Sequence, residues 1–365
     1  MNWHTVAVYY YDDNKDDLVL DAVRPLFDAL PPAVTGAYFA RHWRRGPHLR
    51  LNFRTGRAAL PDGVLPAVEN VVGGFLARRP STAVLDAAEL LPEHRRLAET
   101  EQEPGPLWPW RPDNSVHVEP YDDRAHVLGG QRAAGMLADF YTSTTRHAFD
   151  ATQAVRDGRR QRLWLAFELM IATAHGFAAG GLGRGYLSFR AHAEVFLART
   201  GAADRWRAGW DASYAAAAPA LRERLTGLVS AIDRGRAAGT PYLQCPPAVA
   251  GWLSALAGFR RHCYPLVDSG ELQMDGAPAG QQAPPGASPF LRELITNREF
   301  HERVLPSSGF RRYRLLLNLL YLQLTRLGVR PVDRYLLAHF AANATEELYG
   351  IDPVAQLRAN VRLGS

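Results

Sequence analysis

Cysteine and lysine are almost absent from this 365-residue chain. Cys245 and Cys263 are its cysteines, and no CxxC pair or Cys/His cluster accompanies them. The sequence therefore indicates neither a disulfide framework nor a zinc site, and we expect no metal and a reducing, cytoplasmic compartment. Because Lys15 is the single lysine, nearly all positive charge is carried by arginine, whose planar guanidinium binds carboxylates and peptide carbonyls in a fixed geometry.

Long hydrophobic runs are also missing. No apolar run approaches the ~20 residues of a transmembrane helix, and the first residues lack the cationic and apolar regions of a signal peptide. We therefore expect no membrane partner. The net charge of +5 would suit nucleic acid, but no recognised nucleic-acid-binding motif accompanies it, so we expect no such partner either.

The segment 38–53, YFARHWRRGPHLRLNF, is the most informative part of the chain. Its alternation of apolar and polar residues predicts two strands joined by a turn at Gly46-Pro47. Cations crowd into this predicted hairpin at Arg41, Arg44, Arg45, His48 and Arg50. Since so many cations cannot be buried unpaired, the hairpin is either solvated or binds an anionic or carbonyl-rich ligand.

Side chains two residues apart on a strand share a face. On this basis Trp43 is expected to pair with Arg45, while His48, Arg50 and Asn52 line up on the following strand. The face that carries these three polar side chains is therefore the predicted binding surface.

The rest of the pattern favours an α+β fold, with a mixed or antiparallel sheet and packed helices. Strands are predicted at 3–11 and 117–121, and helices at 18–30, 64–79, 131–153, 160–177, 189–238, 310–327 and 331–349. Loops rich in glycine and proline are predicted at 100–115, 178–186 and 270–288. Because no clean linker interrupts the chain, we expect one composite domain over 1–365, β-rich over about 1–125 and mainly helical over about 126–365.

A second informative block runs from Ser307 to Asp352. In its first helix, Arg314, Asn318 and Tyr321 share a face. An asparagine among leucines must find a partner, so Asn318 is either a structural hydrogen-bonder or a site residue. Tyr313 is expected in the first turn, as an interface tyrosine or as a phenol that projects into a cleft.

The last predicted helix carries His339 and Asn343 at a spacing of four, so the two side chains point the same way. A single helical histidine is either a satisfied core residue or a proton carrier, because its ordinary pKa lies near neutral pH. The sequence pattern leaves both interpretations open.

The GPHLRL motif at 46–51, the VEPYDD motif at 118–123 and the block at 307–352 together resemble the lantibiotic-dehydratase C-terminal and thiopeptide-biosynthesis family over nearly the whole chain. The resemblance implies a fold similar to the glutamate-elimination domain of lantibiotic dehydratases. It also implies one of two activities. One is elimination of glutamate from a glutamylated Ser or Thr; the other is a formal [4+2] aza-cycloaddition of two dehydroalanines that builds the pyridine of a thiopeptide macrocycle.

Two departures from the family pattern favour the cycloaddition. Asn52 stands where eliminating members have a second arginine, and Ala344 stands where they have another. A carboxylate leaving group needs such cations. Ser307 and Tyr313, six residues apart, are similar to the Ser/Tyr pair of pyridine-forming members. Glutamate elimination and a non-catalytic role in leader-peptide binding remain the alternatives.

The resemblance also implies roles for individual residues. The catalytic candidates are Tyr313 as hydrogen-bond donor or general acid, Ser307 polarising the same amide, His339 shuttling protons, and Arg50 stabilising an oxyanion. The substrate-binding candidates are His48, Trp43, Asn52, Arg41, Arg311, Arg314 and Asn318. The implied partners are a precursor peptide with an acidic leader and other biosynthetic enzymes of the pathway. No redox step is needed, so no cofactor is expected.

Overall fold

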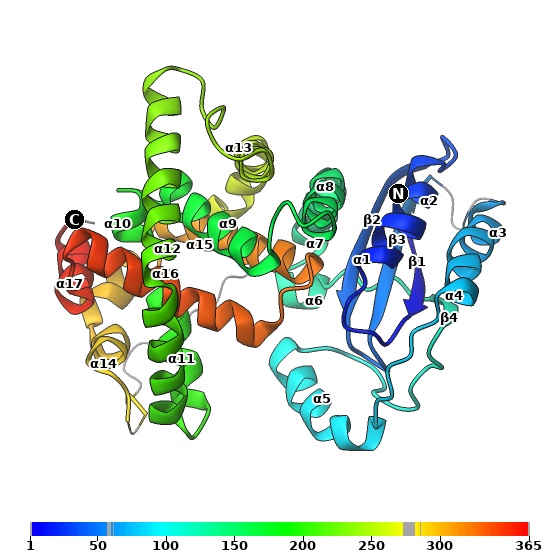
Figure 1. The fold of residues 1–365 in the computed structure, drawn as a ribbon, viewed down its shortest axis with the longest axis horizontal. Coiled ribbons are helices and arrows are strands. Elements are labelled where there is room, and N and C mark those ends of the chain that lie inside the picture. The colour runs from blue at the N-terminus through cyan, green and yellow to red at the C-terminus, as the bar shows by residue number, and fades with distance from the viewer. Residues whose placement is uncertain (1, 57–59, 61, 273–281, 285, 364–365) are drawn as a thin grey trace. The chain divides into compact units, whose positions relative to one another are not determined.

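The computed structural model describes residues 2–56, 60, 62–272, 282–284 and 286–363 (Figure 1). The chain divides into two compact units. The first unit comprises Met1–Arg159 and Thr325–Gly328, and the second comprises Arg160–Leu324 and Val329–Ser365. The change from strand-rich to helical sequence near residue 125 therefore lies inside the first unit.

A four-stranded antiparallel sheet organises the first unit, in the order β2-β3-β1-β4. Its strands are β1 (Asn2–Tyr9), β2 (Val34–His42), β3 (His48–Thr55) and β4 (Ser115–Glu119). These strands confirm the predicted hairpin, the opening strand and the later short strand, and with them the α+β class. The β2–β3 turn requires glycine at Gly46, because φ is 110° there and a Cβ atom would lie 2.7 Å from the Tyr11 hydroxyl.

One face of the sheet is apolar and helices cover it. Its fully buried side chains include Val6, Val8, Phe39, Leu49, Leu51 and Phe53. Phe53 contacts Phe27 and Phe39 stacks on Phe149, with ring centroids 5.8 and 5.4 Å apart. The helices at 18–30 and 64–79 are confirmed, each with a central π-helical turn. The first consists of α1 (Asp16–Leu18), η1 (Val19–Val23) and α2 (Arg24–Asp28). The second consists of α3 (Val64–Val68), η2 (Glu69–Gly73) and α4 (Gly74–Arg78).

The remaining helices of the first unit depart from prediction in two places. They are α5 (Ala87–Glu101), α6 (Ala125–Leu128), α7 (Gln131–Ser143) and α8 (Thr145–Arg156). The single helix predicted at 131–153 is two, because the chain breaks at Thr144. The sequence did not predict α5, although Asp86 caps its start by accepting hydrogen bonds from the backbone of Ala88 and Glu89.

The second unit is helical in its described residues. Its helices are α9 (Arg162–Phe177), α10 (Leu182–Gly185), α11 (Leu187–Arg199), α12 (Ala203–Ala237), α13 (Pro247–Asp268), α14 (Pro289–Thr296), η3 (Phe300–Val304), α15 (Ser308–Arg326), α16 (Pro331–Tyr349) and α17 (Pro353–Leu363). The predicted helices at 160–177, 310–327 and 331–349 are confirmed, whereas the one at 189–238 is interrupted near 200–202. α9 is almost wholly buried, and α16 packs against α9, α11 and α12.

The remaining expectations concern two glycine-rich loops and membrane-spanning helices. The glycine-rich segment at 178–186 interrupts the helices as predicted, apart from the one-turn α10. The predicted loop at 270–288 overlaps 273–281 and 285, which lie outside the described residues. Within the described part of the chain, no single helix is long and apolar enough to cross a membrane; only α9 and Leu182–Arg199 together pass that test, as a pair bent by 107°.

Candidate active site

The polar face of the hairpin forms as the sequence predicts. His48, Arg50 and Asn52 alternate with buried apolar residues on β3 and therefore share one face of the sheet. In the antiparallel register, Ala7 on β1 and Ala40 on β2 are the partners of Arg50. These small neighbours leave room above the sheet for the guanidinium group.

Trp43 and Arg45 do not lie on a strand, so the predicted pairing of their side chains is wrong. β2 ends at His42, and both residues belong to the turn that follows. The Trp43 Nε1–H donates a hydrogen bond of 3.0 Å to Glu101, and its ring stacks on His42 at 5.5 Å. The Arg45 Nε–H donates to the carbonyl of Pro109 at 2.7 Å.

Glu103 forms ion pairs with several arginines in and near the hairpin. Its carboxylate is fully buried, and its ion-pair partners are Arg44 at 3.1 Å, Arg50 at 3.4 Å and Arg124 at 2.8 Å; His42 Nε2 lies 3.4 Å from it. Burial would raise the pKa of Glu103, but the hydrogen bond from His42 and the charges of Arg50 and Arg44 outweigh it and lower the pKa to about 2. Burial, reinforced by Arg50, lowers the pKa of His42 to about 4, so this imidazole is neutral at pH 7.

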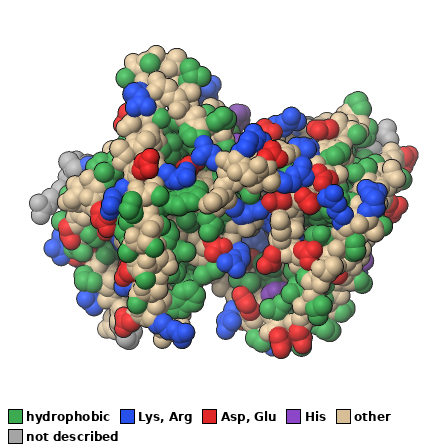
Figure 2. Space-filling model, in the orientation of Figure 1, with side chains coloured by type: hydrophobic (Ala, Val, Ile, Leu, Met, Phe, Trp, Pro, Cys, Tyr) green, Lys and Arg blue, Asp and Glu red, His purple; other side chains and the backbone are tan. Residues whose placement is uncertain are grey.

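Arg50 therefore has partners within the chain. Besides Glu103, it contacts Asp122 at 3.5 Å, and 14% of its side chain is exposed. An anion does bind the hairpin cations, as their number suggested, but it is a carboxylate of the protein itself. Basic and acidic side chains are likewise interspersed on the face shown in Figure 2.

Arg41 lies on the other face of the sheet. It is paired in register with Leu49, which points into the apolar core. Its guanidinium donates to the carbonyls of Arg326 and Asp13, each at 3.1 Å, and lies 3.7 Å from Asp16. The sequence grouped Arg41 with Arg50, but the alternation of the strand separates them.

His48 and Asn52 are buried, and both have partners. His48 Nδ1 is hydrogen-bonded to the Gly46 carbonyl at 2.9 Å, and burial holds the pKa of His48 well below its ordinary value. The Asn52 carbonyl oxygen accepts a hydrogen bond of 2.7 Å from the Thr5 hydroxyl. In this structure both side chains stabilise the sheet.

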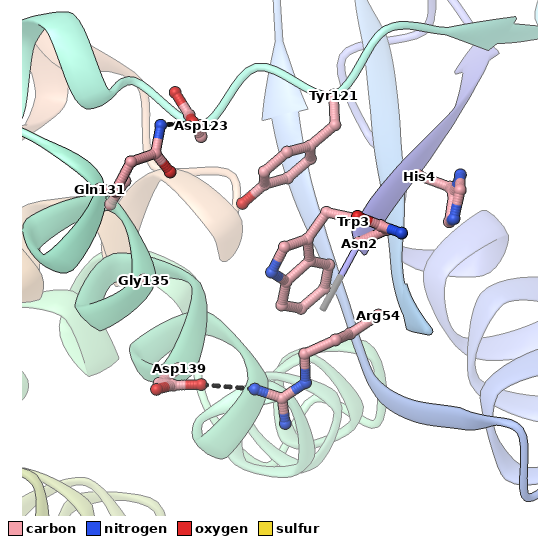
Figure 3. A pocket seen from close by; sticks show the side chains of 10 residues that line it. Asn2, Trp3, His4, Arg54, Tyr121, Asp123, Gln131, Gly135 and Asp139 are labelled. Carbon is pink, nitrogen blue, oxygen red and sulfur yellow. Dashed lines mark hydrogen bonds and ion pairs between the residues drawn. The ribbon is translucent and has the colours of Figure 1, made fainter. Parts of the chain in front are cut away.

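A pocket of about 580 Å³ opens beside the same sheet face (Figure 3). Its lining residues are Asn2, Trp3, His4, Arg54, Tyr121, Asp123, Gln131, Ala134, Gly135 and Asp139. Trp3 and Tyr121 stack with ring centroids 5.5 Å apart. An Arg54–Asp139 ion pair of 2.8 Å and an Asp123–Gln131 hydrogen bond of 2.8 Å supply polar groups. The sequence did not predict this pocket, because its walls include three segments that are far apart along the chain: β1, α7 and the segment that follows β4.

Tyr313 lies in the interior of the second unit. It is in the second turn of α15, not the first as predicted, because the helix begins at Ser308. Only 7% of the residue is exposed, and its hydroxyl donates a hydrogen bond of 2.9 Å to the Gly185 carbonyl. Burial raises the pKa of Tyr313 well above its ordinary value. Gly185 permits this contact, since a Cβ there would lie 2.8 Å from the tyrosine hydroxyl.

Ser307 is exposed and caps α15. Its hydroxyl donates to the Val304 carbonyl at 2.7 Å and accepts from the Phe310 backbone at 3.3 Å. Farther along the helix, Arg311 and Arg314 are half-buried, whereas Asn318 is exposed. Asn318 therefore does not need the buried partner that its leucine neighbours suggested.

His339 is buried in α16. Its Nε2 lies 2.9 Å from an Asp211 carboxylate oxygen and 3.0 Å from the Asn343 amide nitrogen, which confirms that the two helix neighbours point the same way. Burial, together with the charge of Arg190, lowers the pKa of His339 to about 4. Ala344 on the same helix is fully buried.

The second unit also holds a cavity of about 80 Å³, lined by His192, Tyr321, Arg334 and Tyr335. The sequence placed Tyr321 on a shared helix face but missed its contact with His192, since nothing local indicates that α11 meets α15. Cys245 and Cys263 are buried free thiols. Within the described ranges, no group of three or more His, Cys, Asp or Glu side chains is arranged to hold a metal ion.

Comparison with solved structures gives two informative matches. The pyridine synthase TbtD from thiomuracin biosynthesis is 38% identical in sequence, with a TM-score of 0.77, over 96% of this chain and 100% of TbtD. TsrL is 22% identical, with a TM-score of 0.72, over 98% of each chain, and this likeness shows a shared fold. Among curated proteins, the search finds no match.

The sequence model described as "Lantibiotic biosynthesis dehydratase C-term" matches residues 3–345. The match includes the GPHLRL motif of the hairpin and most of the C-terminal block, on which the resemblance rested. It thus confirms the predicted likeness to lantibiotic dehydratases, and the chain belongs to the lantibiotic biosynthesis dehydratase C-terminal family.

Proposed function

We propose that this chain is a pyridine synthase of thiopeptide biosynthesis. The observation that carries the proposal is the 38% identity to the pyridine synthase TbtD, spread over 96% of this chain and all of TbtD. The proposed substrate is a precursor peptide with two dehydroalanines and several azole rings, still joined to its leader. The proposed products are a pyridine macrocycle, water and the released leader.

The charges around the family motifs support cyclisation over glutamate elimination. The retained Arg50 already pairs with Glu103 and Asp122. Asn52, in place of a second arginine, is committed to the Thr5 hydroxyl. Ala344 is fully buried in α16, so a longer cationic side chain there would have to displace its packed neighbours. An expelled glutamate carboxylate would find few available cations at these positions.

The proposed mechanism has two requirements. The enzyme must fold a flexible peptide so that its two alkenes meet, and such orientation can contribute about 7–11 kcal/mol. It must also move protons: one amide becomes an iminol, the resulting 2-azadiene adds to the second alkene, and the ring then loses water and the leader to become aromatic. Proton transfer of this kind typically gains about 10²–10⁴-fold in rate. None of these steps is a net oxidation, so we propose no cofactor.

We keep Tyr313 as the proposed donor to the reacting amide, Ser307 as a second donor to it, and His339 as a proton carrier. For Tyr313 this role requires its hydroxyl to give up the hydrogen bond to the Gly185 carbonyl and to donate to the substrate amide instead. Arg50 is proposed to bind a substrate carbonyl, since a guanidinium held by carboxylates still has N–H groups to donate.

The aromatic pocket of the first unit is proposed to hold part of the precursor peptide. The stacked Trp3 and Tyr121 offer a flat apolar surface for an azole ring, and Arg54 supplies a donor beside it. Trp108, 56% exposed, offers another such surface. The net charge of +5 favours an acidic leader. We place the reaction in the cytoplasm, alongside the other enzymes of the pathway.

Tyr313→Phe tests the proposed donor. The variant should bind the precursor normally and form the pyridine about 10²-fold more slowly. Tyr349→Phe, at an exposed position of α16, is the matched control and should behave as wild type. Cyclisation by Tyr313→Phe at the normal rate would remove this tyrosine from the mechanism without affecting the assignment of the reaction.

A further inference from the structure

A phenol and an imidazole meet in the small cavity of the second unit. The Tyr321 hydroxyl, on α15, and His192 Nδ1, on α11, share a hydrogen bond of 2.5 Å. Their rings lie 4.8 Å apart. Both side chains are half-buried and line the cavity of about 80 Å³. Unlike Tyr313, Tyr321 therefore borders a space that another group can enter.

Burial keeps both members of this pair neutral, and cations add to the effect at His192. Arg334 lies over the Tyr321 ring, 5.7 Å from its centroid, and donates to the Tyr321 carbonyl at 3.3 Å. Burial, together with the charges of Arg334 and Arg314, lowers the pKa of His192 to about 4. Burial raises the pKa of Tyr321 above its ordinary value. Near neutral pH the pair is therefore a neutral phenol beside a neutral imidazole.

The hydrogen bond is compatible with two tautomers of His192, and one of them suits proton transfer. A neutral phenol can donate its O–H to Nδ1, and the imidazole proton then resides on Nε2. In that tautomer the pair combines an acceptor, Tyr321 Oη, with a donor, His192 Nε2–H, on two residues that line the cavity. An amide needs this combination in order to tautomerise, because it must lose a proton from nitrogen and gain one on oxygen.

The cavity has the size of one such group. On the cavity measure one water needs only about 10–15 Å³, so about 80 Å³ leaves space for a small planar group such as an amide. Tyr335 forms a further wall, and its ring is held by stacking on Phe196 at 4.4 Å.

Building on the proposed function, we propose that Tyr321 and His192 form a proton relay that converts a dehydroalanine amide of the substrate into its iminol. The amide N–H bond breaks and its proton passes to Tyr321 Oη, while the Tyr321 proton passes to His192 Nδ1. The His192 Nε2–H proton passes to the amide oxygen. Three X–H bonds break and three form, no charge is left behind, and His192 returns to its starting tautomer by exchange with water.

The test uses the full-length protein and a dehydrated, azole-bearing precursor, with pyridine formation followed by absorbance and mass. Tyr321→Phe and His192→Gln should each lower kcat by about 10²-fold or more, with precursor affinity and melting temperature near the wild-type values. Tyr349→Phe is again the matched control. A residue with only a structural role would change stability or affinity along with kcat.

The outcomes separate the relay from the function on which it rests. If the wild-type protein forms no pyridine, the proposed function is wrong and the relay is wrong with it. If the wild type forms the pyridine and either variant retains a normal kcat, the relay is wrong and the function stands. Should one variant fail to fold, the kcat of the other decides.

Discussion

At the scale of single residues, one buried carboxylate accounts for the arginine-rich hairpin. Glu103 lies in the segment after α5, outside the motif, yet it pairs with Arg44, Arg50 and Arg124. A buried charge is tolerated when it is paired in this way, and the same pairing connects the segment to the sheet. Because the contact joins distant parts of the sequence, the motif alone could not disclose it.

Glu103→Gln should destabilise the first unit by about 3 kcal/mol, because it removes the negative charge and leaves several cations half-buried around a neutral amide. Chemical denaturation monitored by tryptophan fluorescence measures this loss. Glu101→Gln is the matched control: Glu101 is exposed and bonds Trp43, so its loss should cost less than about 1 kcal/mol. Equal effects of the two substitutions would contradict the role given to Glu103.

The pH dependence of Glu103 has a definite sign. Its pKa is lowered from 4.5 to about 2 in the folded protein. The stability that it contributes is therefore fully present above about pH 4.5 and is lost as the pH falls toward 2. Wild type should lose more stability than Glu103→Gln between pH 5 and pH 3, and parallel acid profiles of the two proteins would argue against the ion-pair cluster.

Lys15 adds a second pH dependence of the same sign, at alkaline pH. The residue is only 4% exposed, and burial lowers its pKa from 10.5 to about 7. Between these two values the unfolded chain binds the proton and the folded chain does not, so stability contributed by this group rises with pH across the window. The stability difference between Lys15→Met and wild type should therefore shrink from pH 7 to pH 9, as urea unfolding at each pH can measure. A constant difference would mean that Lys15 keeps its proton in the fold.

At the scale of elements, the packing of α16 limits which side chain position 344 can accommodate. Ala344 is fully buried on this helix, which packs against α9, α11 and α12. Ala344→Arg should cost at least about 3 kcal/mol, since it overfills the packing and buries an unpaired charge. Leu348→Arg, at a 38% exposed position of the same helix, should be near neutral in the same thermal-denaturation assay. A stable Ala344→Arg protein would reopen the case for a glutamate-binding arginine here.

Some elements could be predicted from the sequence pattern alone, and others could not. The β2–β3 hairpin was predictable because its alternation and its Gly46-Pro47 turn are local. α5 was missed because Pro92 and many charged residues mask its periodicity, although the Asp86 cap was a readable signal. α15 was predicted, but the burial of Tyr313 was not, because it depends on Gly185 of α10.

At the scale of the whole molecule, the candidate residues differ in how far the sequence could identify them. Local motifs drew attention to Arg50 and Tyr313, and the family resemblance suggested their roles. The partners that decide what each side chain can do, such as Asp122 for Arg50, come from distant segments. The Trp3–Tyr121 pocket and the Tyr321–His192 pair are products of the fold, and only the three-dimensional structure brings their members together.

The most direct test of the account is the reaction itself. The full-length protein is incubated in parallel with a dehydrated, azole-bearing precursor and with a glutamylated precursor, and products are followed by mass and absorbance. We expect the first precursor to lose its leader and water and to gain the absorbance of a pyridine, while the second is unchanged. Release of free glutamate from the second precursor, with no ring formed from the first, would contradict the assignment.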